Sequence, residues 1–258
     1  VEVGTRAARA GVHMLVEKPL ATDAASARVL ASEAESAGVL LQVGHLERFN
    51  PVMDEVHRLI GTPRFVECHR LSPFAGRGTD ANVVVDVMIH DLDLLAFLVD
   101  RPIVDVQAVG VPVLSETVDI ANARIRFEGG CIANVTASRV SLKRERKMRI
   151  FQEDAYVSLD LECRSALIAR RRDPASSPAS RTAVGSPADC PIGSPMDAIE
   201  VETREFADAD PLAAQIKSFV TAVREGRPPA VGAREAIDAL EMAGRIIDCI
   251  EVPGSEAS

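Results

Sequence analysis

The sequence predicts an α/β fold in two parts: a piece of parallel β-sheet at the N-terminus, then an α+β domain with an open, mostly antiparallel β-sheet. Up to about residue 45, helical stretches alternate with short, mostly apolar runs, which is typical of buried parallel strands. After Pro102, apolar and polar residues alternate with period two between turn signals such as Glu128-Gly129-Gly130, which is typical of an antiparallel meander.

The parallel part consists of two units, each a helix followed by a strand. Gly11 and Gly38 stand where a helix ends in a left-handed cap, and Thr22 or Asp23 is a suitable N-cap for the second helix. The expected elements are a helix over 1–10, a strand over 12–16, a helix over 23–37 and a strand over 39–43. Because the chain opens inside helical sequence at Val1, without an initiator methionine, we expect it to be a piece of something longer.

The second part opens with mixed elements and continues as the meander. In chain order we expect a helix over 51–60, a strand over 64–71, a helix over 82–99, and strands over 104–113, 120–127, 131–138, 147–151, 155–160 and 165–170. Residues 173–198 are rich in proline and serine, which predicts a surface loop. A C-terminal helix over 233–251 repeats apolar residues at helical spacing and is expected to dock back on the body.

The composition indicates a globular protein that binds neither nucleic acid nor membranes. The 258 residues include 29 Lys and Arg against 38 Asp and Glu, a net charge of −9, and 47% of them are hydrophobic. The five cysteines form no C-x-x-C pair, which favours a reducing, cytoplasmic location without disulfides. No apolar run reaches the roughly 18 residues that span a bilayer, and the N-terminus does not resemble a signal peptide.

Lys18 ends the first buried strand, within the run Val16-Glu17-Lys18-Pro19. Ligands of open α/β sheets collect beyond the carboxyl ends of the strands, and Pro19 holds Lys18 out of the helical region and fixes the turn. Lys18 is therefore a candidate for placing an ammonium group in a crevice. The alternative is a solvated residue at the end of a strand.

A second candidate site lies inside the helix over 82–99. Spacings of four and seven residues put Asp86, His90 and Asp93 on one face, while Asp91 points elsewhere. Because the rest of the helix is apolar, this stripe must either find partners in the core or line a cavity. A core histidine satisfied by a neighbouring carboxylate is the simpler interpretation, and two carboxylates in register favour a site.

Polar residues also follow the second buried strand. His45, Arg48 and Asn50 lie at the expected ligand-facing edge of the sheet. The alternative is an ordinary linker in which Asn50 and Pro51 begin the next helix as N-cap and first residue.

Two further features carry little signal. The stretch that starts Gly76-Arg77-Gly78 matches G-x-G-x-x-A, but Pro73 and Phe74 interpose after the preceding strand and the stretch lies well beyond the α/β segment, so it is a weak dinucleotide fingerprint. Arg77 would either reach an anionic substrate group or lie in a surface turn. The basic run over 143–149 is expected to be a solvated rim of the sheet. The remaining histidines, His13, His57 and His69, share no ligand spacing with carboxylates, so we expect no metal site.

The runs Leu15-Val16-Glu17-Lys18-Pro19-Leu20-Ala21 and Asp86-x-x-x-His90-x-x-Asp93 together resemble the two signatures of the glucose-fructose oxidoreductase, inositol dehydrogenase and MocA (Gfo/Idh/MocA) family. The resemblance covers essentially the whole chain. It implies that residues 1–47 are the C-terminal remnant of a Rossmann-type dinucleotide-binding domain. Residues 48–258 would then be a substrate and oligomerisation domain, with helices on one face of its open sheet.

The resemblance also implies a chemistry: hydride transfer from the carbon of a secondary sugar hydroxyl to NAD or NADP. By motif, Lys18 would lie at the nicotinamide and substrate, His90 would take the hydroxyl proton, and Asp86 would bind or orient the substrate. The bond between Lys18 and Pro19 would be cis. The implied cofactor contacts are Glu17, Lys18, Pro19, His45 and Arg48, and the implied substrate contacts are Arg48, Asn50, Arg77, Asp86 and His90.

Within the family, the runs over 43–51 and 88–95 look most like the branch that acts on UDP-N-acetyl-hexosamines or their uronates, such as the UDP-N-acetylglucosamine 3-dehydrogenases that supply amino sugars for lipid A. The implied partner is a small sugar or nucleotide-sugar, and the open sheet implies a homodimer or homotetramer. The family's glycine-rich pyrophosphate turn is absent from this sequence, so we expect weak cofactor binding and little activity.

Two other functions stay open. A metal-dependent phosphohydrolase would use His90 and Asp91 as ligands, but it needs further ligands on neighbouring helices, where this sequence predicts strands. A non-catalytic oligomerisation or binding domain would use the open sheet as its surface.

Overall fold

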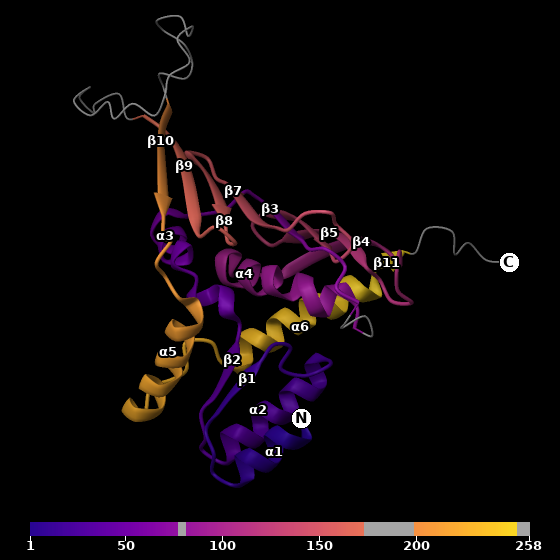
Figure 1. The fold of residues 1–258 in the computed structure, drawn as a ribbon, viewed down its shortest axis with the longest axis vertical. Helices are drawn as coiled ribbons and strands as arrows, with labels where there is room; N and C mark the ends of the chain where they lie inside the picture. The colour runs from indigo at the N-terminus through magenta and orange to yellow at the C-terminus, as the bar shows by residue number, and fades with distance from the viewer. Residues whose placement is uncertain (77–80, 173–198, 252–258) are drawn as a thin grey trace, which may run out of the picture.

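A computed structural model of the chain describes residues 1–76, 81–172 and 199–251. Within these residues the chain forms one small sheet of two strands and one large sheet of nine, with helices between and beside them (Figure 1). The expected loop over 173–198 and the candidate Arg77 lie outside the described residues. In the described part of the chain, no helix is both long and apolar enough to cross a membrane.

The N-terminal part has the two expected units, each of which is a helix followed by a strand. Its elements are α1 (Glu2–Arg9), β1 (Met14–Glu17), α2 (Ala24–Ser36) and β2 (Leu41–Gly44). The two strands pair in parallel, with Met14 opposite Leu41. Asp23 caps α2 by accepting a hydrogen bond from the Ser26 amide at 2.8 Å, which satisfies one of the free amides at the helix start.

The large sheet has the strand order β10-β9-β8-β7-β3-β6-β5-β4-β11. Its strands, in chain order, are β3 (Phe65–Leu71), β4 (Ile103–Val111), β5 (Ile120–Phe127), β6 (Ile132–Ser138), β7 (Glu145–Phe151), β8 (Ala155–Asp160), β9 (Ser165–Arg171), β10 (Ile199–Glu205) and β11 (Ile250–Glu251). All neighbours are antiparallel except β3 with β6 and β11 with β4. The prediction of an open, mostly antiparallel sheet is therefore confirmed.

The simple meander is interrupted where β3 lies between β6 and β7. Val66 and Cys68 of β3 are completely buried, so this strand needs neighbours on both sides. Alternation of apolar residues shows that a segment is extended but carries no information about its partners, which explains why the sequence did not place β3 at the centre.

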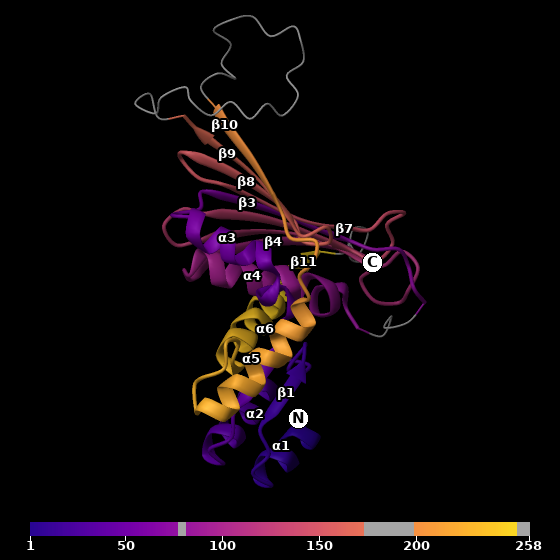
Figure 2. The same cartoon turned by 60° about the vertical axis from the view of Figure 1, so that its left-hand side comes forward.

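Helices cover one face of the large sheet and leave the other face open, as Figure 2 shows. The covering elements are α3 (Pro51–Leu59), the π-helical turn η2 (Val84–Met88), α4 (Ile89–Val99) and α6 (Ala233–Asp248). Completely buried side chains of α4, such as Leu92 and Leu95, pack in one core with Ile125 and Ile150 of the sheet. Helix α6 lies between α4 and α2 and so joins the large sheet to the small one.

The structure differs from the predictions in two regions, the C-terminal part of the chain and the start of the central helix. Strand β10 and helix α5 (Pro211–Glu225) were not predicted, although α5 starts with an Asp210 N-cap and a proline and ends at Gly226. The expected helix over 233–251 ends at Asp248, and Ile250 then pairs with Ala108 of β4. The expected helix over 82–99 begins with the π-turn η2 instead of regular α-helix.

Candidate functional site

The two sequence motifs meet at the carboxyl end of β1. Lys18 Nζ donates a hydrogen bond to the Asp86 backbone oxygen at 2.5 Å and lies 3.3 Å from Asp86 Oδ1. The Lys18 side chain is 16% exposed, against 43% for Asp86. The peptide bond between Lys18 and Pro19 is cis, as the family resemblance implies. A mostly buried ammonium group is thus fixed beside the first turn of the central helix.

His90 lies one turn further along the central helix and shares a small cavity with Asp86. The cavity, of about 160 Å³, is lined by Arg70, Leu71, Ser72, Asp86, Val87, His90, Arg144 and Arg146. The buried His90 Nδ1 has no hydrogen-bond partner among the described residues. Burial, followed by the positive charges of Arg70 and Lys18, lowers the pKa of His90 well below its usual range. His90 is therefore a neutral imidazole at neutral pH, able to accept a proton.

Arg144 and Arg146 belong to the basic run that we expected to be a solvated rim with no function. Their side chains are 59% and 39% exposed, in keeping with a solvated rim, and both also line the cavity beside His90. Sequence reasoning missed the place of Arg146, which is directly opposite Arg70 on the neighbouring strand. Both side chains are on the helix-covered side of the sheet. Strand pairing cannot be deduced from a charge run alone.

Behind the cavity, Arg70 forms a buried ion-pair network. Its guanidinium donates to both carboxylate oxygens of Asp91, at 3.0 and 2.8 Å, and to Glu47 Oε1 at 2.9 Å. Burial alone would lower the pKa of Arg70, but these two carboxylates raise it, so the group stays charged. Asp91 thus points away from His90, as the sequence predicts, and its oxygens are both occupied.

Asp93 does not share the cavity with Asp86 and His90, contrary to the predicted stripe. It is 1% exposed and accepts hydrogen bonds from Arg48 at 2.7 and 3.1 Å. Arg48 also stacks on Phe97, at 4.1 Å from the ring centre.

His45 is buried between the end of β2 and the central helix. Both ring nitrogens are buried without a hydrogen-bond partner among the described residues, and Nδ1 is 3.7 Å from Asp93 Oδ2. Burial lowers the pKa of His45, although Asp93 opposes this shift. Burying two ring nitrogens without hydrogen bonds costs free energy of folding. A ligand group that forms hydrogen bonds with these nitrogens would remove that cost.

Asn50 and Glu17 contribute to the fold around the site. The Asn50 side chain accepts a hydrogen bond from the Val52 amide at 3.4 Å and donates to the Leu161 carbonyl at 3.0 Å, so it serves as the α3 N-cap, with Pro51 next to it. The exposed Glu17 packs against Gly44, where an added Cβ would be 2.7 Å from the carboxylate. Glycine at position 44 thus lets the ends of β1 and β2 approach each other.

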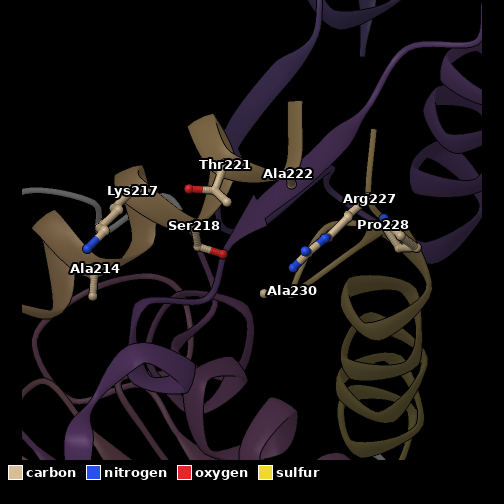
Figure 3. A pocket seen from close by; sticks show the side chains of 8 residues that line it. All are labelled: Ala214, Lys217, Ser218, Thr221, Ala222, Arg227, Pro228 and Ala230. Atoms are coloured by element: carbon tan, nitrogen blue, oxygen red, sulfur yellow. The ribbon is translucent and has the colours of Figure 1, made fainter. Parts of the chain in front are cut away.

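Other parts of the described chain offer less. No group of three histidine, cysteine, aspartate or glutamate side chains is placed to hold a metal ion in residues 1–76, 81–172 and 199–251. A wider hollow of about 430 Å³ lies between α5 and the segment leading to α6 (Figure 3). Its side chains include Lys217 and Thr221 of α5 and Arg227 of the following segment, and none of the predicted site residues lines it.

Comparison with family models gives two matches. Residues 1–45 match the model described as an oxidoreductase family with an NAD-binding Rossmann fold. Residues 57–158 match the model described as the GFO/IDH/MocA C-terminal domain. The first match ends at His45, next to the linker that carries Arg48, and the second includes the central helix and most of the large sheet.

Similar proteins include a UDP-N-acetylglucosamine 3-dehydrogenase of Acidithiobacillus ferrooxidans, which is 36% identical over 223 residues, 86% of this chain and 66% of the relative. This chain therefore spans about two thirds of that relative's length. An inositol 2-dehydrogenase of Rhodococcus erythropolis is 36% identical over 107 residues, which are 39% of this chain and 31% of the relative.

Solved structures give the same picture. The UDP-N-acetylglucosamine 3-dehydrogenase GnnA of Acidithiobacillus ferrooxidans superposes with a TM-score of 0.84 at 33% identity, covering 96% of this chain and 74% of that one. A levoglucosan dehydrogenase in complex with NADH and levoglucosan has a TM-score of 0.78 at 16% identity, again over 96% and 74% of the two chains. At that lower identity, the likeness shows a shared fold.

Proposed function

Because the chain belongs to the glucose-fructose oxidoreductase, inositol dehydrogenase and MocA family, we propose that it acts in NAD(P)-dependent oxidation of a secondary hydroxyl group on a sugar. The observation that supports this most is that Asp86 lines one cavity with His90 and is also contacted by Lys18, at 3.3 Å. A neutral imidazole, an ammonium group and a carboxylate side by side provide a base, a positive charge and an acceptor for hydroxyl groups.

His90 is proposed as the group that takes the hydroxyl proton. A base must be unprotonated before it can act, and burial keeps the imidazole of His90 neutral. Lys18 is proposed to stabilise the negative charge that develops on the same oxygen. Its ammonium is held by the Asp86 backbone oxygen, so it needs little reorganisation when the charge appears.

The residues at the ends of β1 and β2 fit the nicotinamide end of NAD or NADP. The unpartnered nitrogens of His45 and the ammonium of Lys18 are polar groups that a carboxamide or ribose would satisfy. Glu17 and Pro19 are the proposed wall on the same side, and Arg48 positions this edge through Asp93. When bound, the cofactor supplies the hydride acceptor.

A UDP-N-acetyl-hexosamine is the proposed substrate. The support is the 36% identity to the UDP-N-acetylglucosamine 3-dehydrogenase over most of this chain, together with the basic side chains that line the cavity. Four free cysteines in the described part of the chain, two of them exposed, support a location in the reducing cytoplasm.

The open face of the large sheet is proposed to mediate self-association into a dimer or tetramer. On that face Phe65, Phe151 and Tyr156 are neighbours on three strands, with ring centroids 5.5 and 4.9 Å apart. The same row continues to Ala169 and Val201 on β9 and β10. A row of apolar side chains across an uncovered sheet is a suitable surface for a second copy. Light scattering of the purified protein, with Phe151→Glu as the disrupting variant, tests this.

The proposed activity is tested by binding and turnover. The chain has no tryptophan and one tyrosine, so the fluorescence of NADH is followed with little interference. Saturable NADH binding, and reduction of NAD or NADP with UDP-N-acetylglucosamine, are the expected results. Binding of the sugar nucleotide without any turnover would instead favour the non-catalytic alternative.

A further inference from the structure

We propose that Arg144 and Arg146 form an anion-binding subsite that holds the phosphate groups of the sugar substrate. This inference rests on the proposed function, because it places the sugar itself beside His90. It assigns a ligand to two side chains that the proposed chemistry does not use.

The cavity runs from a buried wall to an exposed rim. The side chain of Arg70 is 6% exposed, that of Arg146 is 39% exposed and that of Arg144 is 59% exposed, and all three line the same cavity with His90. A ligand whose reacting carbon lies at His90 would therefore extend outward past Arg146 to Arg144. A ligand with its sugar at the buried wall and a charged group at the exposed rim would match this order of residues.

Arg146 places a second guanidinium group beside that of Arg70 at the cavity. It faces Arg70 directly across two paired strands, where like charges repel each other. Asp91 and Glu47 offset this repulsion, because both bond Arg70 and the Glu47 carboxylate is also 3.7 Å from Arg146. Arg146 also contacts Glu162, at 3.0 Å.

Glu162 is the carboxylate that the phosphate would replace. It is 36% exposed and contacts both rim arginines, with Arg144 at 3.7 Å and Arg146 at 3.0 Å. Ion pairs this exposed are worth little, so a better anion can displace Glu162 at small cost. Guanidinium groups bind phosphate oxygens through paired, charge-assisted hydrogen bonds, which exceed what a single shared carboxylate provides.

A diphosphate suits this rim better than the carboxylate of a uronate sugar. A sugar carboxylate is attached to the ring and would lie near the wall, where Arg70 is already fully engaged by Asp91 and Glu47. Two phosphates reach further out and carry enough charge for both rim arginines. The probes that separate the two ligands are UDP, which has the diphosphate but no hexose, and glucuronate, which has a carboxylate and no phosphate.

The test is calorimetric titration of the whole chain with UDP, with glucuronate and with free N-acetylglucosamine. We expect Arg146→Gln to raise the Kd for UDP about ten- to hundredfold, Arg146→Lys to raise it less, and Glu162→Gln to lower it. Arg149→Gln is the matched control, because Arg149 is on the same strand, pairs with Glu67 at 2.7 Å and lies on the open face. Its Kd for UDP should equal that of the wild type.

The outcomes separate this inference from the proposed function. If UDP-N-acetylglucosamine is oxidised but its KM is the same in Arg146→Gln, the subsite is wrong and the activity stands. If UDP binds through Arg146 but no sugar nucleotide is oxidised, the subsite stands and the activity is wrong. The phosphate assignment would be overturned if the wild type did not bind UDP. It would also be overturned if Arg146→Gln lost binding of glucuronate but kept its affinity for UDP. Thermal melts show whether each variant is folded.

Discussion

Lys18 donates a hydrogen bond to the backbone oxygen of Asp86, although 68 positions separate the two residues. The lysine directly follows strand β1 of the small sheet, and the aspartate lies in the π-turn that precedes the central helix, which covers the large sheet. This one contact brings the carboxyl end of β1 to the cavity that contains His90. Chemistry at the cavity therefore depends on how the two sheets are held together.

Replacing Lys18 is expected to reduce catalysis far more than stability. Lys18→Met keeps much of the side-chain volume but removes the charge beside the reacting oxygen. We expect kcat to fall about 10²- to 10³-fold in steady-state assays, with a small change in melting temperature. Lys217→Met, which alters an exposed lysine in the separate hollow beside α5, is the control. Near-normal turnover in Lys18→Met would remove the proposed role.

The pH dependence of activity is expected to reflect the lowered pKa of His90. A base whose pKa lies below its usual value of 6.5 stays unprotonated in mildly acidic solution. We therefore expect the acid limb of the kcat/KM profile to lie below pH 6.5. His90→Asn should lose both the limb and most of the rate. An acid limb centred at or above pH 6.5 that persists in His90→Asn would assign it to another group.

Stability is expected to fall in mild acid because of His45. Its folded pKa is lower than the usual value of 6.5, so the unfolded chain binds more protons there, and stability drops as pH falls below about 6.5. The melting temperature of His45→Gln should therefore fall less between pH 7.5 and pH 5 than that of the wild type. His57→Gln, at an exposed histidine, should behave like the wild type. Equal losses in all three proteins would contradict this origin of the acid sensitivity.

The sequence allowed most of the framework to be predicted and only part of the site. The helices and strands up to Arg171 follow from periodicity and caps, because those signals are local. Asp86 and His90 could be placed together by helical spacing, whereas Lys18 could be joined to them only through the family resemblance. The engagement of Asp93 by Arg48 and the facing pair Arg70 and Arg146 depend on tertiary packing and on strand order, which residue spacing does not encode.

A buried carboxylate outside the cavity supports the loop between β4 and β5. Asp119 is 0% exposed and accepts hydrogen bonds from Arg139 at 2.7 Å, from the Leu114 amide at 2.6 Å and from the Ser115 hydroxyl at 2.6 Å. Burial alone would raise the pKa of Asp119, but these donors hold it well below its usual value of 3.8. Arg139 also donates to the Ala81 carbonyl at 2.7 Å, so one network ties two loops together.

Asp119→Asn is therefore expected to destabilise the fold at neutral pH by about 1.5–3 kcal/mol, because it removes the negative charge that accepts the hydrogen bonds from Arg139, Leu114 and Ser115. The measurement is urea unfolding at pH 7, with Glu116→Gln on the exposed part of the same loop as control. Since a lowered folded pKa stabilises only above the unfolded value, the difference between wild type and Asp119→Asn should shrink as pH falls below about 3.8. A difference that is small at pH 7, or independent of pH down to pH 3, would show that the hydrogen bonds to Asp119 contribute little as charge-assisted bonds.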